Sequence, residues 1–226
     1  MINLFLISLI AYLVGSFPTA YLIAKKLTGK DIRKIGSGNI GALNALRVIK
    51  GEKAAKLAIV GFISVLIIDM GKGALAIFSA QQLFGSSLSL ALILSAFFVV
   101  LGHNYSIFFK FKSGGRGAAC LMGILLCLDP FSLLVWGLPI IFLSILAQLI
   151  LEKKGLEKKI NWQKFPEIFS ILGKQMVGRM AGLILAPIPL YFYSPQIFLP
   201  IAAGTILLLI KNIPRFEGYL QEIHGK

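Results

Sequence analysis

The sequence predicts an all-α integral membrane protein, a compact bundle of about seven transmembrane helices. Three observations predict this class: 57% of the 226 residues are hydrophobic, only 14% are charged, and the mean hydropathy is +0.85. Several apolar runs are long enough to cross a bilayer. The net charge of +14 belongs to the loops that flank these runs. Anionic substrates and membrane lipids are therefore the expected partners, and nucleic acid is not.

The first apolar run, residues 1–24, contains no charged residue and is long enough to span the membrane. Pro18 lies near its end and is expected to kink the helix and to free backbone carbonyl groups. The run lacks a basic amino-terminal region and further spans follow, so a cleaved signal peptide is not expected. Residues 25–56 then carry nine lysines and arginines against two acids. This loop is therefore predicted to be cytoplasmic, with the amino terminus outside.

Six further apolar runs alternate with short outer turns and basic loops. We expect spans over residues 57–84, 88–101, 118–128, 131–151, 180–191 and 197–210. Seven crossings leave the carboxyl terminus inside, as a basic tail. The third basic loop, residues 152–179, is long enough to hold an interfacial helix around 162–172. A single domain over residues 1–226 is the simplest organisation.

A glycine-rich segment of the first cytoplasmic loop, residues 36–47, is the strongest candidate for chemistry. Three glycines alternate with Ser37 and Asn39, which lets the backbone N–H groups approach a ligand closely. If a helix begins after the third glycine, Asn44 and Arg47 lie on one face near its start, where an anion is stabilised. Arg47 adds a planar guanidinium suited to phosphate. The alternative is a loop that only lets helices pack, with Arg47 at lipid headgroups.

Asp69 and Lys72 lie inside the second predicted span, where charged side chains are costly. At a spacing of three residues they share a helix face and neutralise each other. One interpretation is a structural ion pair that locks two helices together. The other makes Lys72 a counter-charge for phosphate, held in place by Asp69. The second interpretation requires that the span is broken or opens onto a cavity.

A second basic loop, residues 102–117, has the same character as the first. His103 at the inner end of the third span is a candidate proton acceptor near neutral pH, although a histidine there also serves as a headgroup or backbone partner. Residues 113–117 are Ser-Gly-Gly-Arg-Gly, a flexible loop suited to an anion. The spacing fits neither a Walker A motif nor a dinucleotide fingerprint.

Metal, disulfide and cofactor chemistry find no support in the sequence. Cys120 and Cys127 lie seven residues apart in an apolar run and indicate no disulfide framework. His103 and His224 have no companion ligand at a usable spacing. We therefore expect no metal and no cofactor. Nothing in the sequence sets the oligomeric state, and a monomer is compatible with it.

In their order along the chain, these motifs resemble the bacterial membrane glycerol-3-phosphate acyltransferases that use acyl phosphate as donor (PlsY). The resemblance covers most of the chain. It rests on residues 15–21 (GSFPTAY), 31–39 (DIRKIGSGN), 44–47 (NALR), 69–73 (DMGKG), 102–104 (GHN), 114–117 (GGRG) and 212–215 (NIPR). Several separate motifs in one order are a stronger signal than any one of them.

The resemblance implies a seven-helix enzyme of the bacterial inner membrane with its active site facing the cytoplasm. It implies transfer of a fatty acyl group from acyl phosphate to the 1-hydroxyl of sn-glycerol 3-phosphate, giving lysophosphatidic acid and phosphate, the first step of phospholipid synthesis. His103 and Ser37 are the candidates for positioning or proton transfer. The residues implied to bind phosphate or substrate are Ser37, Gly38, Asn39, Asn44, Arg47, Lys72, Gly114, Gly115, Arg116, Gly117, Asn212 and Arg215.

Several positions depart from the family's usual pattern. Leu43 stands in place of threonine, Ser113 lengthens the second glycine loop by one residue, Arg116 replaces lysine, Leu209 stands where the family has histidine, and residues 152–175 resemble an insertion. Two alternatives therefore stay open: a catalytically impaired lipid-binding paralogue, and a membrane transporter of a small organic phosphate. Transport requires access from both faces, yet the outer turns hold almost no cationic groups. The sequence sets neither the acyl-chain length nor the role of the insertion.

Overall fold

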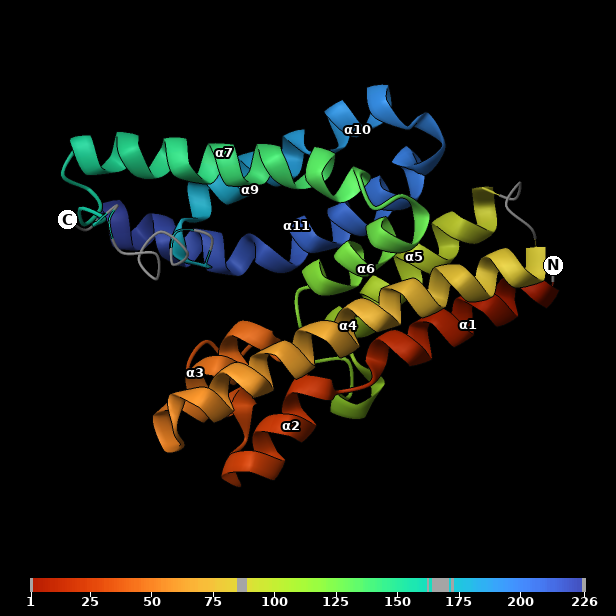
Figure 1. Ribbon diagram of the computed structural model, residues 1–226, viewed down its shortest axis with the longest axis horizontal. Helices are drawn as coiled ribbons and strands as arrows, with labels where there is room; N and C mark the ends of the chain where they lie inside the picture. Colours follow the sequence, from red (N-terminus) through yellow and green to blue (C-terminus); the bar gives the residue numbers. More distant parts are fainter. Residues whose placement is uncertain (1, 85–88, 162, 164–170, 172, 225–226) are drawn as a thin grey trace. The chain divides into compact units, whose positions relative to one another are not determined.

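The computed structural model describes residues 2–84, 89–161, 163, 171 and 173–224, and within these residues the chain is helical with no strand. Contacts divide it into two compact units, Met1–Pro130 with Leu199–Leu208 and Phe131–Phe198 with Leu209–Lys226. The elements (Figure 1) are α1 (Ile2–Ser16), α2 (Thr19–Thr28), η1 (Ile32–Lys34), α3 (Ala42–Glu52), α4 (Ala55–Phe84), α5 (Ser89–Asn104), η2 (Ile107–Phe109), α6 (Ala118–Leu128), α7 (Ser132–Lys153), α9 (Met176–Leu185), α10 (Pro187–Tyr193) and α11 (Pro195–His224).

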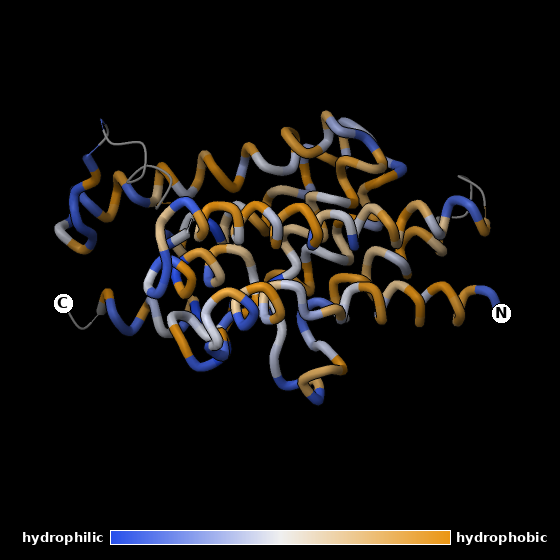
Figure 2. Tube along the Cα trace, turned by 60° about the horizontal axis from the view of Figure 1, so that its bottom comes forward, coloured by the Kyte–Doolittle hydropathy of each residue, from blue (hydrophilic) through white to orange (hydrophobic). Residues whose placement is uncertain are grey.

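The helices confirm an all-α integral membrane protein. Among the described residues, six helical stretches are long and apolar enough to cross a membrane, and the eleven-residue α6 is a shorter apolar helix. These helices lie where the spans were predicted, and the number that cross the membrane stays a prediction. Figure 2 shows apolar residues along the helices and hydrophilic residues mainly in the connections. Large apolar side chains such as Phe5 (71% exposed) and Phe192 (78% exposed) lie on the surface, as a lipid-facing protein requires. The orientation of the chain and the single-domain organisation stay predictions.

One feature differs from the expectation at the carboxyl-terminal end, and another prediction there is not tested. The last helix, α11, does not end at Ile210 but continues to His224. Its extension is held within the second unit, where Arg215 donates to the carbonyl oxygen of Gly173 and the hydroxyl of Tyr219 donates to Glu157. These contacts join residues far apart in the sequence, so local patterns do not reveal them. The interfacial helix expected around residues 162–172 lies almost entirely outside the described residues.

Close helix packing in the first unit depends on glycines that face a neighbouring backbone. A Cβ built on Gly15 of α1 would lie 2.0 Å from the carbonyl oxygen of Val99 in α5, and one on Gly102 of α5 would lie 2.1 Å from that of Tyr12 in α1. Small residues of this kind let membrane helices approach closely. The consequence is that α1 and α5 are locked in register at the end where the polar residues gather.

Glycines that face a neighbouring backbone also let α4 pack closely against α6. A Cβ on Gly73 would lie 2.0 Å from the carbonyl oxygen of Cys120, and one on Gly123 would lie 1.8 Å from that of Met70. The glycine that follows Lys72 therefore accommodates helix α6. Gly71, by contrast, has no neighbouring atom within 4 Å of its Cβ position.

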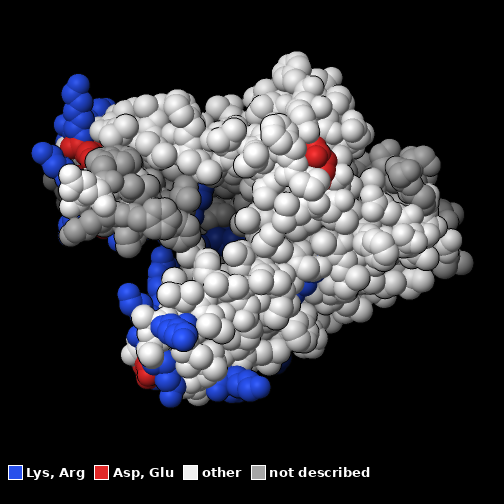
Figure 3. Space-filling model, viewed as in Figure 1, with Lys and Arg blue, Asp and Glu red and all other residues white. Residues whose placement is uncertain are grey.

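Helices α2, α3 and the start of α4 form a separate small core that carries the first basic loop. Ala24, Ile32, Ala45, Ile49 and Ala58 are fully buried in this cluster. The apolar faces of α2 and α3 meet there, because both short helices are amphipathic. Lysines and arginines gather on the outside of α2 and α3, at the Ala55 end of α4 (Figure 3).

Candidate functional site

The candidate site is built at a break between α1 and α2. Pro18 has no N–H to donate and interrupts the helix, so nearby carbonyl groups lose their intrahelical partners. Two side chains from other parts of the chain supply hydrogen bonds to these carbonyl groups. Ser106 Oγ donates to the carbonyl oxygen of Ser16 at 2.6 Å, and Lys72 Nζ donates to that of Phe17 at 2.6 Å. The break is therefore fastened to the rest of the first unit. The kink expected at Pro18 is confirmed and is a full interruption.

A buried charged cluster lies beside this break. Lys72 Nζ is 2.6 Å from Asp69 Oδ1, and their side chains are only 5% and 2% exposed. His103 Nδ1 lies 4.0 Å from the same carboxylate oxygen. Helix α4 runs unbroken through Asp69 and Lys72, so Lys72 reaches a recess because the first span is broken and not because the second one is.

The second glycine loop folds over the end of α5. The Gly115 N–H donates to the carbonyl oxygen of His103 at 2.8 Å, and a Cβ on Gly115 would lie 1.9 Å from His103 Nε2. A Cβ on Gly114 would lie 2.3 Å from the carbonyl oxygen of Asn104. A side chain at Gly114 would clash with backbone, and one at Gly115 would displace the His103 imidazole. The backbone of the loop therefore packs directly against the His103 imidazole.

These elements line a small, partly open recess in the first unit. Its polar wall comes from the α1–α2 break, the charged cluster and the second glycine loop, and its residues include Ser16, Thr19, Asp69, Lys72, His103, Ser106, Gly114 and Gly115. An ammonium group has three N–H donors, and Lys72 uses two of them on Asp69 and Phe17. The third makes no hydrogen bond to a described residue, which leaves a buried cationic donor for an anionic ligand.

The first glycine loop is shaped by Asn44. Its Oδ1 accepts from the Ser37 N–H at 3.0 Å, and its Nδ2 donates to the carbonyl oxygens of Ile32 and Ile35. Gly36 and Gly38 both adopt positive φ, as the tight turn requires. The helix expected after the third glycine is confirmed as α3. Because both amide hydrogens of Asn44 are already used, this residue positions the loop.

Other predicted ligands of this loop lie on its outside. Ser37 and Arg47 are exposed, Asn39 is half-buried, and Arg47 makes no hydrogen bond or ion pair with any described residue. The Ile40 N–H donates to the carbonyl oxygen of Gly114 at 3.1 Å, which joins the first glycine loop to the second. The recess itself takes in Ile40 but not Ser37, Asn39 or Arg47.

The remaining predicted ligands are distributed between the units. Arg116 is half-buried and Gly117 is buried with a left-handed φ of 82° at the start of α6. Asn212 is buried and Arg215 holds the Gly173 carbonyl, both in the second unit. The roles of all four in substrate binding stay predictions. The described residues contain no group of three histidine, cysteine, aspartate or glutamate side chains placed to hold a metal ion.

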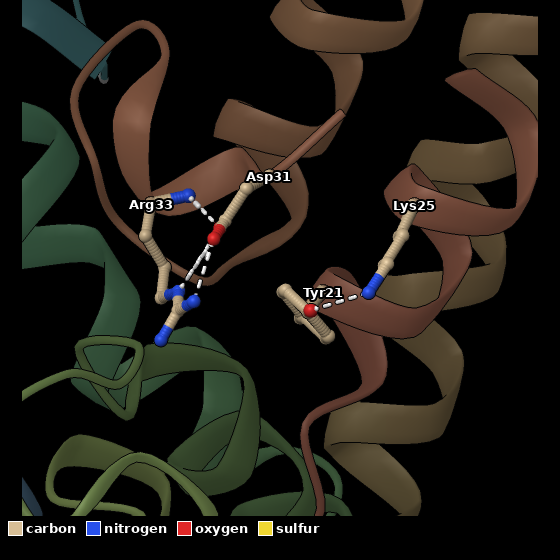
Figure 4. A network of polar contacts seen from close by, with 4 residues as sticks. All are labelled: Tyr21, Lys25, Asp31 and Arg33. Atoms are coloured by element: carbon tan, nitrogen blue, oxygen red, sulfur yellow. Dashed lines mark hydrogen bonds and ion pairs between the residues drawn. The ribbon is translucent and has the colours of Figure 1, made fainter. Parts of the chain in front are cut away.

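A second polar network, outside the recess, fixes the turn between α2 and α3 (Figure 4). The guanidinium of Arg33 donates to both carboxylate oxygens of Asp31, at 2.6 Å to Oδ2 and 2.9 Å to Oδ1. Its Cζ lies 4.7 Å from the ring centre of Phe109 and 5.4 Å from that of Tyr21. Hydrogen bonds from Arg33 lower the pKa of the Asp31 carboxyl to about 2. The network anchors the first glycine loop to α2 and η2.

Sequence reasoning assigned no role in the site to three polar residues of the recess wall: Ser16, Thr19 and Ser106. A signal for two of them was present, because hydroxyl residues flank Pro18 on both sides. Ser106 had no such signal, since its contact with Ser16 joins residues 90 positions apart. The wall of the recess therefore contains hydroxyl residues in addition to the glycines and cationic groups that the motifs indicate.

Fold and site together define an α-helical integral membrane protein with a small polar recess, in which a buried lysine and a histidine lie beside a glycine-rich loop. Residues 5–153 match the family model described as glycerol-3-phosphate acyltransferase. The match covers more than half of the chain, and the chain therefore belongs to the glycerol-3-phosphate acyltransferase family. The resemblance drawn from the sequence motifs is confirmed.

Named relatives agree with this assignment. Glycerol-3-phosphate acyltransferase 2 of Moorella thermoacetica is 44% identical over 137 residues, which are 59% of this chain and 64% of that protein. The glycerol-3-phosphate acyltransferase of Carboxydothermus hydrogenoformans is 34% identical over 192 residues, 85% of this chain and 90% of that one. The match thus spans slightly less than two thirds of the first relative and nearly all of the second.

The fold is that of a solved membrane enzyme. The crystal structure of PlsY, an integral membrane glycerol 3-phosphate acyltransferase, in its glycerol 3-phosphate form has a TM-score of 0.69 at 22% identity, over 97% of this chain and 92% of that one. Its lysophosphatidic acid form has a TM-score of 0.68 at 20% identity. At these identities the likeness shows the fold alone.

Proposed function

We propose that this protein transfers a fatty acyl group from acyl phosphate to the 1-hydroxyl of sn-glycerol 3-phosphate. The observation that carries the proposal is the recess of the first unit, where the buried Lys72 ammonium keeps one N–H for an anion beside His103 and the second glycine loop. Membership of a family named for glycerol-3-phosphate acylation supports it. So do the similar PlsY structures, which are named for this acceptor and for the lysophosphatidic acid product.

The proposed reaction asks mainly for positioning and charge. The hydroxyl oxygen of glycerol 3-phosphate attacks the carbonyl carbon of acyl phosphate, and the ester bond forms as the carbon–oxygen bond to phosphate breaks. The hydroxyl proton leaves with the phosphate, so lysophosphatidic acid and inorganic phosphate are the products. Because acyl phosphate is already activated, the protein needs only to hold two phosphorylated molecules together and to stabilise the developing oxyanion.

Each residue has a proposed part in this scheme. Lys72 supplies positive charge inside the recess, and Asp69 keeps its ammonium in place. His103 and Ser37 position the acceptor or pass its proton. Asn44 acts indirectly, because its amide holds the first glycine loop. The further phosphate contacts are assigned to Gly38, Asn39, Arg47, Gly114, Gly115, Arg116, Gly117, Asn212 and Arg215.

The place of the reaction follows from the distribution of charge. The basic loops are expected on the cytoplasmic side of a bacterial inner membrane, where glycerol 3-phosphate is dissolved and acyl chains lie within the bilayer. The chain is proposed to act as one transmembrane domain over residues 1–226, with 152–175 as a cytoplasmic insertion. Acyl phosphate enters from the lipid, and no cofactor takes part.

The direct test uses purified protein in lipid vesicles with palmitoyl phosphate and radiolabelled glycerol 3-phosphate. We expect equal amounts of lysophosphatidic acid and phosphate from the wild type, and at least a hundredfold less from Lys72→Met, since about 2.7 kcal/mol of lost transition-state stabilisation has that effect. Lys50→Met is the matched control, because Lys50 is exposed on α3 and lies outside the recess. Accumulation of unmodified glycerol 3-phosphate inside the vesicles would instead indicate a transporter.

A further inference from the structure

Two hydroxyl groups at the α1–α2 break are buried without a protein partner. Ser16 and Thr19 are 1% and 3% exposed, and both line the recess. Neither Ser16 Oγ nor Thr19 Oγ1 makes a hydrogen bond to any described residue. Buried side-chain hydroxyls are nearly always hydrogen-bonded, so an exception on the wall of a cavity needs an explanation.

The same residue types elsewhere in these helices behave in the ordinary way. Ser8 Oγ in α1 donates to the carbonyl oxygen of Leu4, and Thr28 Oγ1 in α2 donates to that of Ala24. At the break, the local carbonyl oxygens of Ser16 and Phe17 are already taken by side chains from other elements. The carbonyl groups of the break therefore have side-chain partners, while the hydroxyls of two residues that line the recess have none among the described residues.

The other groups on the wall of the recess indicate which kind of ligand suits the two hydroxyls. The recess contains the Lys72 ammonium with one unused N–H, and Asp69, the one carboxylate among the described residues of its wall, is paired with Lys72. Hydroxyl donors beside a buried cation suit a ligand rich in anionic oxygen atoms, because hydrogen bonds to charged acceptors are the strong ones. An apolar acyl chain makes no use of such groups.

We propose that Ser16 and Thr19 are further substrate-binding residues, whose hydroxyls donate hydrogen bonds to phosphoryl oxygens of the phosphorylated molecule that Lys72 balances. The inference rests on the proposed function and deepens it. Pro18 then has a part in the site, since it ends α1 and starts α2 with a hydroxyl on each side of the gap. Glycerol 3-phosphate and acyl phosphate share the phosphoryl chemistry, and the experiment distinguishes them.

The test compares Ser16→Ala, Thr19→Val and the double variant with two matched controls, Ser8→Ala and Thr28→Val. Binding of glycerol 3-phosphate to protein in lipid nanodiscs is measured by titration calorimetry, and KM is measured for each substrate. Loss of a hydrogen bond to a charged oxygen weakens binding by about tenfold or more, so each single variant is expected to raise the Kd or KM of one substrate by that factor. The substrate affected identifies the ligand. The controls are expected to stay within about twofold, because their hydroxyls bond to their own helices.

Folding is checked by the thermal unfolding midpoint. Removing an unsatisfied buried hydroxyl is not expected to lower it. If a variant unfolds, Ser16→Thr and Thr19→Ser keep the hydroxyl, and recovery of binding by these variants supports the proposal. A double variant that folds and binds both substrates like the wild type overturns it, and ordered water then accounts for the two hydroxyls. A wild type that binds glycerol 3-phosphate but transfers no acyl group refutes the proposed function, while the titrations still decide the role of Ser16 and Thr19.

Discussion

At the scale of single residues, buried polar groups define the site. Lys72 was expected either to form an ion pair or to serve a ligand, and the structure combines the pair with a carbonyl contact and an unused donor. Among the described residues, the Asp69 carboxylate is the group that neutralises it, which lowers the cost of burying the charge inside a membrane. Removing one partner of such a pair leaves an uncompensated buried charge, which is costly. Lys72 therefore contributes to the stability of the fold, whichever ligand it binds.

Asp31 carries the pH-dependent prediction. The hydrogen-bonded Arg33 lowers the pKa of its carboxyl from 3.8 to about 2. Since the folded-state value is the lower one, the pair stabilises the fold above about pH 4, and this contribution is lost as the pH falls toward 2. We expect the Asp31 carboxyl to titrate near pH 2 by ¹³C NMR of the protein in micelles, and nearer 3.8 in Arg33→Gln. A wild-type midpoint near 3.8 would show that the pair does not form.

At the scale of elements, the recess results from a broken helix beside an intact one. Helix α4 crosses without interruption, while α1 and α2 are separated at Phe17 and Pro18. Glycine packing of α1 on α5 and of α4 on α6 brings the break next to the charged cluster. The second glycine loop then lines the recess with two residues, Gly114 and Gly115, at which a Cβ would clash with the backbone of Asn104 or with the His103 imidazole.

Gly115 tests this loop. A Cβ there would lie 1.9 Å from His103 Nε2, so Gly115→Ala must displace the imidazole. Because the clash is with a side chain and not with backbone, we expect the variant to fold but to lose about a hundredfold in acyl transfer. Gly71→Ala is the matched control, since nothing lies within 4 Å of its Cβ position, and it is expected to be fully active. Unchanged activity in Gly115→Ala would remove His103 from the reaction.

At the scale of the whole molecule, charge is segregated along the chain. Nine of the lysines and arginines fall in residues 25–56, and the turn around Asp129 contains none. This asymmetry predicts the orientation, because cytoplasmic loops of membrane proteins carry the excess of basic residues. The orientation in turn decides from which side the proposed acceptor, glycerol 3-phosphate, would arrive.

Cysteine labelling measures that orientation. After Cys120 and Cys127 are replaced by alanine, single cysteines are introduced as Lys50→Cys, Asp129→Cys and Glu222→Cys. A membrane-impermeant maleimide applied to spheroplasts is expected to label Asp129→Cys, and to label Lys50→Cys and Glu222→Cys only after lysis. The reverse pattern would place the basic loops outside and contradict a cytoplasmic site.

Much of the fold was predictable, because the position of a membrane helix depends on the hydropathy and length of one short stretch of chain. Hydropathy and run length located the spans, and Pro18 located the break. The end of α11 was not predictable, because Arg215 and Tyr219 hold it to distant residues of the second unit. In the site, glycine spacing located both loops, but not which of their residues line the recess.

By itself the sequence determined the class of protein, the family motifs and the positions of the buried charges, because composition and periodicity report on short stretches of chain. Only the tertiary structure decided that Lys72 meets the broken first span, since the hydrogen bond to Phe17 joins residues 55 positions apart. It likewise placed Ser16, Thr19 and His103 around one recess and left Ser37 and Arg47 outside it. Such contacts depend on how helices pack, and packing is set by the summed fit of many distant side chains.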